Sequence, residues 1–224
     1  MLLEGLRKEL VFYGLEMLRS GLTMHTGGNL SARDPKTGLI AIKPTSVPYR
    51  TLRPEDITVI DENGKQIDGP HPPSSEWPMH TMIYRAKPRV MGIVHHHSIY
   101  ATACSVAQLE IPLINHEISV YCSSPVRVAP FAVPGTPELG ESALKYLGDN
   151  DVVLLQNHGP LAVGATLWHA FDAACAVEQA AATLFITRIL GQVTPIPPEG
   201  LRALRAADPL LAPDDGTPPV IKAV

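Results

Sequence analysis

Histidines stand out among the residues that could do chemistry. The chain has nine of them in 224 residues, and His95, His96 and His97 are consecutive. They follow the apolar run at 90–94, which is typical of a buried strand. Because alternate side chains of a strand point to one side, we expect His95 and His97 to share a face and His96 to point away. Two imidazoles placed in this way can bind one divalent ion, whereas the plainer interpretation is a loop tip with three hydrogen-bonded histidines.

Two further residues could complete a metal site. His158 follows another apolar run, at 152–155, and Glu76 begins an expected helix behind two serines. With His95 and His97 they provide three imidazoles and one carboxylate, which suits Zn²⁺, with Mn²⁺ or Co²⁺ as alternatives. The helix dipole alone also favours a carboxylate at the position of Glu76. For His80, four residues later, a surface histidine is the simpler interpretation than a role behind the metal.

Three segments of small and hydroxyl-bearing residues predict an anion site. They are Thr-Gly-Gly-Asn-Leu-Ser at 26–31, Lys-Pro-Thr-Ser at 43–46, and Ser-Ser at 74–75. Glycine-rich turns and helix N-termini bind phosphate through backbone N–H groups, and Lys43 adds a positive charge. Each segment alone is weak evidence, since Gly-Gly-Asn is usually an ordinary turn. Together, beside a candidate metal site, they favour a phosphorylated ligand.

The elements that must position these residues alternate between helix and strand. Apolar periodicity predicts helices at 2–21, from Ser74 or Ser75 to about 86, and at 98–107, 136–147 and 167–189. Short apolar runs predict strands at 39–42, 57–60, 90–94, 126–128, 152–155 and 161–163. We expect a single domain of α/β or α+β type over residues 1–190. The proline-rich residues 191–224 are expected to form an extended C-terminal arm or a frayed tail.

Composition excludes several classes of protein. With 45% hydrophobic and 18% charged residues, the chain is not disordered. A net charge of −4 argues against nucleic acid or an anionic membrane as the main partner. No apolar run approaches 18 residues, so no membrane-spanning helix is expected, and the first residues lack the pattern of a secretory signal. Three widely spaced cysteines favour the reducing cytoplasm.

Five motifs occur in an order that resembles a known family. They are the segments at 26–31 and 43–46, Ser-Ser-Glu at 74–76, His-His-His-Ser at 95–98 and Gln-Asn-His-Gly at 156–159. They look like the class II aldolase and ribulose-5-phosphate 4-epimerase family, and the resemblance covers roughly residues 5–190. It implies an α/β/α sandwich around a largely antiparallel sheet. It also implies a homotetramer with a divalent metal, usually zinc, near the subunit interfaces.

The resemblance carries specific roles over to this chain. His95, His97 and His158 match the metal histidines, and Glu76 matches the acidic residue that serves as metal ligand and then as acid or base. Glu76 favours the aldolases, because the epimerases of the family usually have Asp there. The positions that match phosphate-binding residues of the family are Gly28, Asn29, Thr45, Ser46, Ser74 and Ser75.

These features predict a metal-dependent lyase of carbohydrate metabolism. It would cleave a small ketose 1-phosphate, such as a deoxyketose 1-phosphate, to dihydroxyacetone phosphate and an aldehyde. The chain departs from the fuculose-type aldolases in two ways. It has Ser46 where they tend to have glycine. It also lacks two of their tyrosines, one of which has His116 or Glu117 as its nearest counterpart. We therefore assign His116 a catalytic role at the aldehyde oxygen, which it would reach across a subunit boundary.

Three alternatives stay open. A pentulose-5-phosphate 4-epimerase is favoured by Lys43 and opposed by Glu76. A dehydratase acting on methylthioribulose 1-phosphate would use the same metal site to break a different bond. A non-catalytic scaffold like adducin has no chemical need for the metal histidines and the acid, and their presence argues against it.

Overall fold

The computed structural model describes residues 1–207, and its centre is a single eight-stranded sheet in the order β4-β3-β2-β1-β5-β8-β7-β6. All neighbouring strands are antiparallel except β6 and β7, which are parallel. The sheet therefore agrees with the largely antiparallel arrangement that the motifs implied. The strands are β1 (Asn29–Arg33), β2 (Ile40–Ile42), β3 (Thr58–Ile60), β4 (Gln66–Asp68), β5 (Gly92–His95), β6 (Val128–Ala129), β7 (Val152–Leu155) and β8 (Gly159–Gly164).

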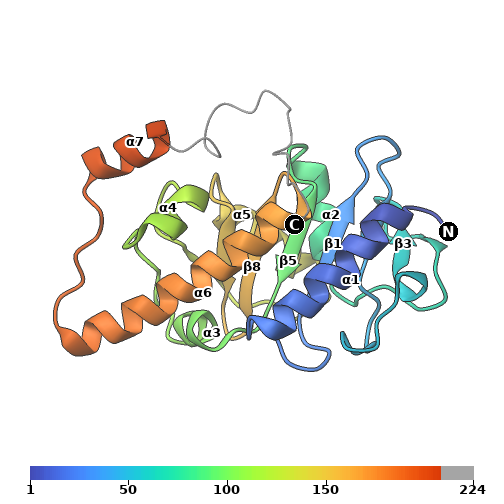
Figure 1. Cartoon of the computed structure of the whole chain (residues 1–224), viewed down its shortest axis with the longest axis horizontal. Coiled ribbons are helices and arrows are strands. Elements are labelled where there is room, and N and C mark those ends of the chain that lie inside the picture. Colours follow the sequence, from blue (N-terminus) through green and yellow to red (C-terminus); the bar gives the residue numbers. More distant parts are fainter. Residues whose placement is uncertain (208–224) are drawn as a thin grey trace.

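Helices cover both faces of this sheet (Figure 1). Adjacent strand residues point to opposite faces, so Val94 packs with the helices of one layer and Ile93 with those of the other. The result is the predicted α/β/α sandwich. One layer contains α1 (Glu4–Arg19), α3 (Ile99–Val106), α4 (His116–Tyr121) and α6 (Leu167–Leu190), and the other contains α2 (Trp77–Ala86) and α5 (Pro137–Leu147).

Helix α6 is the longest described element, and it lies across the sheet (Figure 1). It buries small side chains such as Ala170, Ala173 and Val177, which bring its backbone close to β5 and β8. By length and composition it would also pass for a membrane span, which the sequence was expected not to contain. One such helix is weak evidence for a membrane span, and α6 packs on β5 and β8 with part of its apolar window buried inside the domain.

Several elements differ from the expectation. Strand β1 includes part of the segment interpreted as a glycine-rich turn, and β4 and α4 were not predicted. In the proline-rich arm, the structure contains the helix α7 (Pro198–Ala207), which lies beside α4 (Figure 1). The backbone N–H of Ile196 donates to the carbonyl of Leu113, so the arm returns onto the body of the domain. The rest of the predicted arm, residues 208–224, lies outside the described residues.

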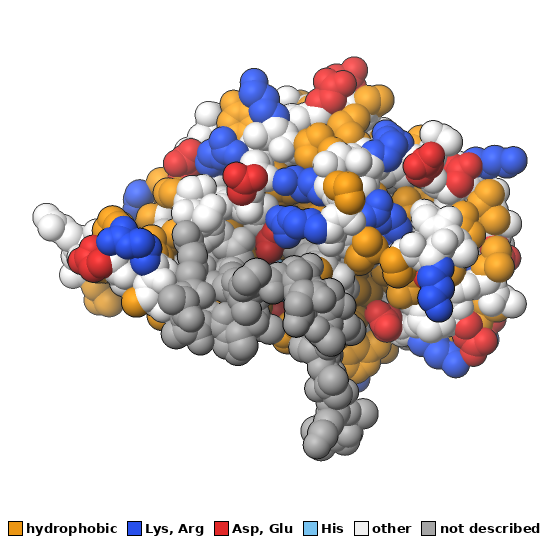
Figure 2. Space-filling view, turned by 90° about the horizontal axis from the view of Figure 1, so that it is seen from above, with side chains coloured by type: hydrophobic (Ala, Val, Ile, Leu, Met, Phe, Trp, Pro, Cys, Tyr) orange, Lys and Arg blue, Asp and Glu red, His pale blue; other side chains and the backbone are white. Residues whose placement is uncertain are grey.

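The surface carries charges of both signs. Figure 2 shows one face of the molecule, on which acidic side chains lie among the basic ones with apolar side chains between them. A mixed distribution of this kind differs from the basic stripe that is typical of nucleic-acid-binding proteins. That the chain binds neither nucleic acid nor membrane stays a prediction.

Candidate active site

Three imidazoles converge at the end of β5 and the turn between β7 and β8. The Nε2 atom of His95 lies 3.0 Å from that of His97 and 3.2 Å from that of His158. His95 ends β5, which pairs with β8, so the two chain segments meet side by side. In a tetrahedral zinc site with Zn–N distances of about 2.0–2.1 Å, the nitrogens lie about 3.3 Å apart. The separations are therefore close to those of a shared metal ion.

Hydrogen bonding and burial prepare these rings to accept a cation. The Nδ1 atom of His95 lies 2.9 Å from the carbonyl of Pro160, which only accepts, so the proton is on Nδ1 and the lone pair of Nε2 faces the cluster. Burial lowers the pKa of His95 well below its usual value, with smaller contributions from His158 and His97. Burial also lowers the pKa of His97, to about 4, and the pKa of His158. All three rings are neutral at pH 7.

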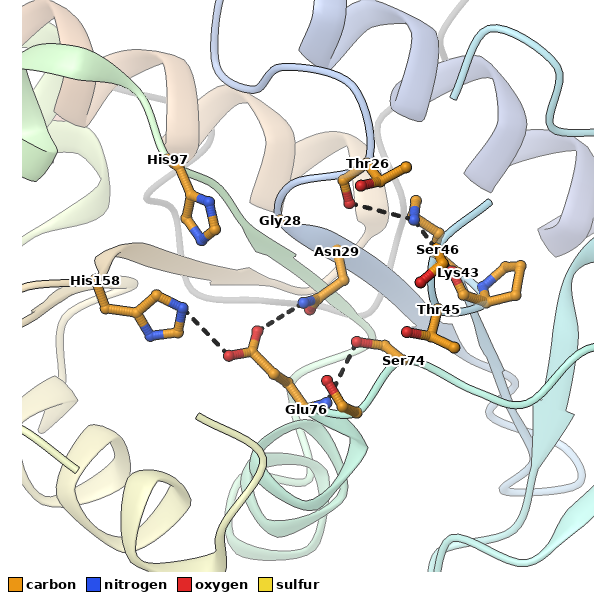
Figure 3. A pocket seen from close by; sticks show the side chains of 12 residues that line it. Thr26, Gly28, Asn29, Lys43, Thr45, Ser46, Ser74, Glu76, His97 and His158 are labelled. Atoms are coloured by element: carbon orange, nitrogen blue, oxygen red, sulfur yellow. Dashed lines mark hydrogen bonds and ion pairs between the residues drawn. The ribbon is translucent and has the colours of Figure 1, made fainter. Parts of the chain in front are cut away.

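Glu76 faces this cluster from the start of α2 (Figure 3). Its Oε1 atom lies 3.3 Å from Nε2 of His158, and its Oε2 atom lies 3.3 Å from Nε2 of His95. The carboxylate is buried, and Oε1 has no hydrogen-bond partner among the described residues. A buried, unpartnered carboxylate oxygen beside three neutral imidazoles is costly unless a cation compensates it. The donor set therefore fits a divalent metal.

A hydroxyl-lined pocket of about 170 Å³ adjoins the cluster (Figure 3). The side chain of Lys43 is buried in its wall, 4.7 Å from the centre of the Tyr49 ring. Its ammonium donates to the carbonyls of Pro44, at 3.1 Å, and Thr26, at 3.5 Å, and burial lowers its pKa to about 8. Residues that line the pocket are Thr26, Gly28, Asn29, Lys43, Pro44, Thr45, Ser46, Ser74, Ser75, Glu76, His97 and His158.

Backbone conformation explains two residues of this pocket. Gly28 has φ 64°, and a Cβ there would lie 2.4 Å from the carbonyl oxygen of His95, so only glycine fits between β1 and the histidine segment. Ser46 also has a positive φ, 58°, although a side chain disfavours that conformation. It occupies the position where the fuculose-type aldolases tend to have glycine.

The structure brings together all six residues predicted for phosphate binding, with Glu76, His97 and His158. His95 has no exposed surface and does not line the pocket, but its Nε2 atom lies beside that of His158. His96 points away as predicted, and neither of its ring nitrogens has a hydrogen-bond partner among the described residues. His116 is the exposed first residue of α4 and does not line this pocket.

His80 differs from its interpretation as a surface residue. It is completely buried, because α2 turns this side toward β1, where Asn29 and Ser31 offer polar partners. The signal that could have revealed it is the spacing of Glu76, His80 and Tyr84, which places all three on one face of a helix.

Comparison with known proteins identifies the class. Residues 8–185 match the family described as the class II aldolase and adducin N-terminal domain, and the chain belongs to that family. With the acid and the three histidines in place, it is a class II aldolase, as the motifs predicted.

Individual relatives are similar over most of their length. The chain is 35% identical to a 5-deoxy-D-ribulose 1-phosphate aldolase of Bacillus thuringiensis, over 91% of this chain and 95% of the relative. It is 36% identical to the L-fuculose phosphate aldolase of Escherichia coli K12, over 86% of this chain and 87% of the relative. A solved L-fuculose 1-phosphate aldolase superposes with a TM-score of 0.85 and 34% identity, covering 89% of this chain and 94% of that one.

Proposed function

We propose that the protein cleaves a 5-deoxypentulose 1-phosphate to dihydroxyacetone phosphate and a short aldehyde. The observation that carries the proposal is that two half-sites adjoin: three imidazoles with the Glu76 carboxylate beside them for a cation, and a hydroxyl-lined pocket for an anion. A ketose 1-phosphate presents its carbonyl close to its phosphate, so both half-sites can hold one small molecule. The similarity to a 5-deoxy-D-ribulose 1-phosphate aldolase supports the absence of a terminal hydroxyl in the substrate.

The phosphate would be held on the side of the pocket away from the histidines. Ser74, Ser75 and Thr45 bring hydroxyl groups to the pocket, which Asn29 and Gly28 line between these hydroxyls and the metal cluster. The ammonium of Lys43 would balance the negative charge at short range. Because the pKa of Lys43 is about 8, a bound dianion would also hold this group in its charged form.

His95, His97, His158 and Glu76 would hold the metal, which we propose to be zinc, with manganese or cobalt as substitutes. The bound ion would supply a Lewis acid that polarises oxygen atoms of the substrate. Glu76 would move the proton: as the C3–C4 bond breaks, the C4 hydroxyl loses a proton and the Glu76 carboxyl delivers one to C3. The proton gained at C3 balances the one lost from the hydroxyl.

An apolar loop supports a substrate with an apolar end. Phe131 and Val133 are more than half exposed in the loop between β6 and α5. The backbone N–H of Phe131 donates to Oε1 of Gln156, two residues before His158, and Gly135 lies against Ser75. A substrate whose far end reaches from the pocket to this loop would find apolar surface there for a terminal methyl group.

The assembly is proposed to be a homotetramer in the cytoplasm. Exposed apolar side chains gather on α3 and the second half of α6, which is typical of a subunit interface. In a tetramer, His116 would contact the aldehyde oxygen of a substrate bound in the pocket of a neighbouring subunit, since α4 lies outside the pocket of its own chain. The exposed residues are Ile99, Tyr100, Val106, Phe185, Ile186, Ile189 and Leu190.

One assay tests the proposal. Metal-replete enzyme is supplied with a panel of ketose 1-phosphates and 5-phosphates, and dihydroxyacetone phosphate release is followed through a coupled reductase. We expect release from 5-deoxypentulose 1-phosphates, and its loss in Glu76→Gln and in metal-free enzyme. Absence of release from every 1-phosphate would contradict the proposal.

A 4-epimerase activity beside the aldolase reaction is a second candidate, because Lys43, the residue that favoured it in the sequence, is buried in the pocket wall. Inversion at C4 of a pentulose 5-phosphate without release of fragments would favour it. Loss of water from a methylthioribulose 1-phosphate would instead indicate the dehydratase.

A further inference from the structure

A row of five buried polar side chains leads from the pocket into the domain. Asn29 donates from Nδ2 to Oε2 of Glu76 at 2.7 Å, and its Oδ1 lies 2.5 Å from Nε2 of His80. On the other side of the ring, Nδ1 of His80 lies 2.7 Å from Oγ of Ser31, which lies 2.8 Å from the hydroxyl of Tyr84. None of the five is more than 5% exposed. Glu76 and Asn29 line the pocket, and His80, Ser31 and Tyr84 extend the polar environment of Glu76 beyond it.

Secondary structure builds this row. Glu76, His80 and Tyr84 are four residues apart at the start and along one face of α2, and Asn29 and Ser31 are two residues apart on one face of β1. Four helical residues rise about 6 Å, and two strand residues rise about 6.6 Å. The two spacings match, so side chains from the helix and the strand alternate along the row.

The charge of Glu76 and the neutral ring of His80 fix which atom donates in the hydrogen bonds of the row. Burial lowers the pKa of His80 to about 3, so its ring is neutral and carries one N–H. The Glu76 carboxylate only accepts, so the Asn29 amide turns its NH₂ group toward it and its carbonyl toward His80. His80 must then donate from Nε2 and accept at Nδ1, from the hydroxyl of Ser31. Every polar side-chain atom along the row except Oε1 of Glu76 finds a complementary partner.

We propose that His80 is a positioning residue, which acts through Asn29 to hold the Glu76 carboxylate in one orientation toward the three histidines. With Oε2 tied to Asn29, Oε1 is the oxygen left without a hydrogen bond, and it faces His158. The inference rests on the role proposed for Glu76 as the group that moves the proton to C3. It adds that this role depends on a residue that touches neither substrate nor metal.

The test compares His80→Leu with His80→Gln. Leucine removes the donor and leaves Asn29 Oδ1 without its partner, whereas glutamine can return an N–H near the position of Nε2. Partners behind metal ligands typically contribute about 10–100-fold in activity, so we expect His80→Leu to lower kcat by that factor with KM within about threefold. His80→Gln should recover most of the loss.

Thr81→Val is the matched control. Thr81 is buried on the same helix, and among residues 1–207 its hydroxyl bonds only to the carbonyl of Pro78, at 3.2 Å, so the variant perturbs the same core without touching the row. Metal content and melting temperature are measured for all three variants. Equal kcat losses in His80→Leu and Thr81→Val, or a wild-type kcat in His80→Leu, would overturn the proposal.

A second measurement separates this proposal from the substrate assignment. Exchange of the C3 proton of dihydroxyacetone phosphate with deuterated water reports proton movement by Glu76 alone, without an aldehyde. We expect His80→Leu to slow this exchange about as much as it lowers kcat, and a wild-type rate would overturn the role of His80. If no 5-deoxyketose phosphate is cleaved but the exchange still depends on His80, the substrate assignment fails and the positioning role stands. If the wild-type protein shows no exchange, a crystal structure of His80→Leu decides: an unchanged Glu76 orientation would overturn the proposal.

Discussion

The two halves of the pocket hold their side chains in different ways. In the metal half, His95 and Glu76 are buried, His158 is half-buried and His97 is exposed, and the carbonyl of Pro160 fixes the tautomer of His95. In the hydroxyl half, Thr45, Ser46 and Ser75 are exposed on loops. A site on the rigid sheet is held in one geometry, whereas exposed loop hydroxyls can rotate to suit a ligand. The difference teaches that the reaction depends on the buried half, and the fit to a particular sugar phosphate on the exposed half.

Removal of a ligand from the buried half should have the largest effect. We expect His95→Ala to lose the bound metal and to lower kcat/KM by at least about 10²-fold, since the remaining donors no longer surround a cation. Metal analysis of the purified protein and steady-state kinetics measure both effects.

Two variants serve as controls for this prediction. His71→Ala removes a half-exposed histidine paired with Asp56, and it should keep its metal. Ser75→Ala, in the exposed half, should also keep its metal and change KM by only a few-fold, as for a single neutral hydrogen bond. If Ser75→Ala loses as much activity as His95→Ala, the two halves do not differ as we describe.

The sequence predicted that His95, His97 and His158 lie together, and their role as metal ligands stays a prediction. His95 comes directly after one apolar run and His158 follows another after two residues, and adjacent strands of a sheet bring such ends together. His80 could not be placed in this way, since its burial depends on which face of α2 meets β1. The position of His116 also could not be derived from the sequence, because α4 is a six-residue helix without apolar periodicity. The catalytic role predicted for His116 would in addition need a second subunit.

Lys43 is a charged residue of the anion half that is buried, as its neighbours Asn29 and Ser74 are. We expect Lys43→Met to raise KM for a phosphorylated substrate about 10–100-fold, which is the loss of one or two charge-assisted hydrogen bonds, with kcat changed much less. Lys36→Met changes an exposed lysine and should leave KM unchanged. An unchanged KM in Lys43→Met would mean that the phosphate is held by hydroxyls and backbone alone.

Acid should weaken the buried half through His80. Its folded pKa of about 3 is below the usual 6.5, so between these values the unfolded chain binds a proton that the folded chain does not. The free energy of unfolding therefore falls as the pH drops below 6.5, by about 2 kcal/mol at pH 5 for this group. Urea unfolding of the metal-free protein at pH 7 and pH 5 measures the loss. His80→Gln should lose about 2 kcal/mol less than wild type between the two pH values, and an equal loss in both would rule out this source.

The smallest effect is expected at Ser46, where the exposed half combines backbone strain with a polar group. A residue other than glycine at φ 58° costs about 1 kcal/mol or more, whereas glycine adopts this conformation freely and loses more entropy on folding. The two terms nearly cancel, so Ser46→Gly should change the free energy of unfolding by no more than about 1 kcal/mol, toward higher stability. The loss of the hydroxyl should raise KM a few-fold.

Ser46→Ala separates the two contributions, because it removes the hydroxyl and keeps the strain. It should raise KM as much as Ser46→Gly does, without the gain in stability. Melting temperature and KM of both variants are compared with those of the wild type. If KM is unchanged in both, the hydroxyl does not contact the ligand, and the serine has the strain of this turn without a benefit for binding. If KM rises in both, this chain has a side-chain donor where its fuculose-type relatives tend to have glycine, which would mean that the exposed half of the pocket has been adjusted while the buried half was kept.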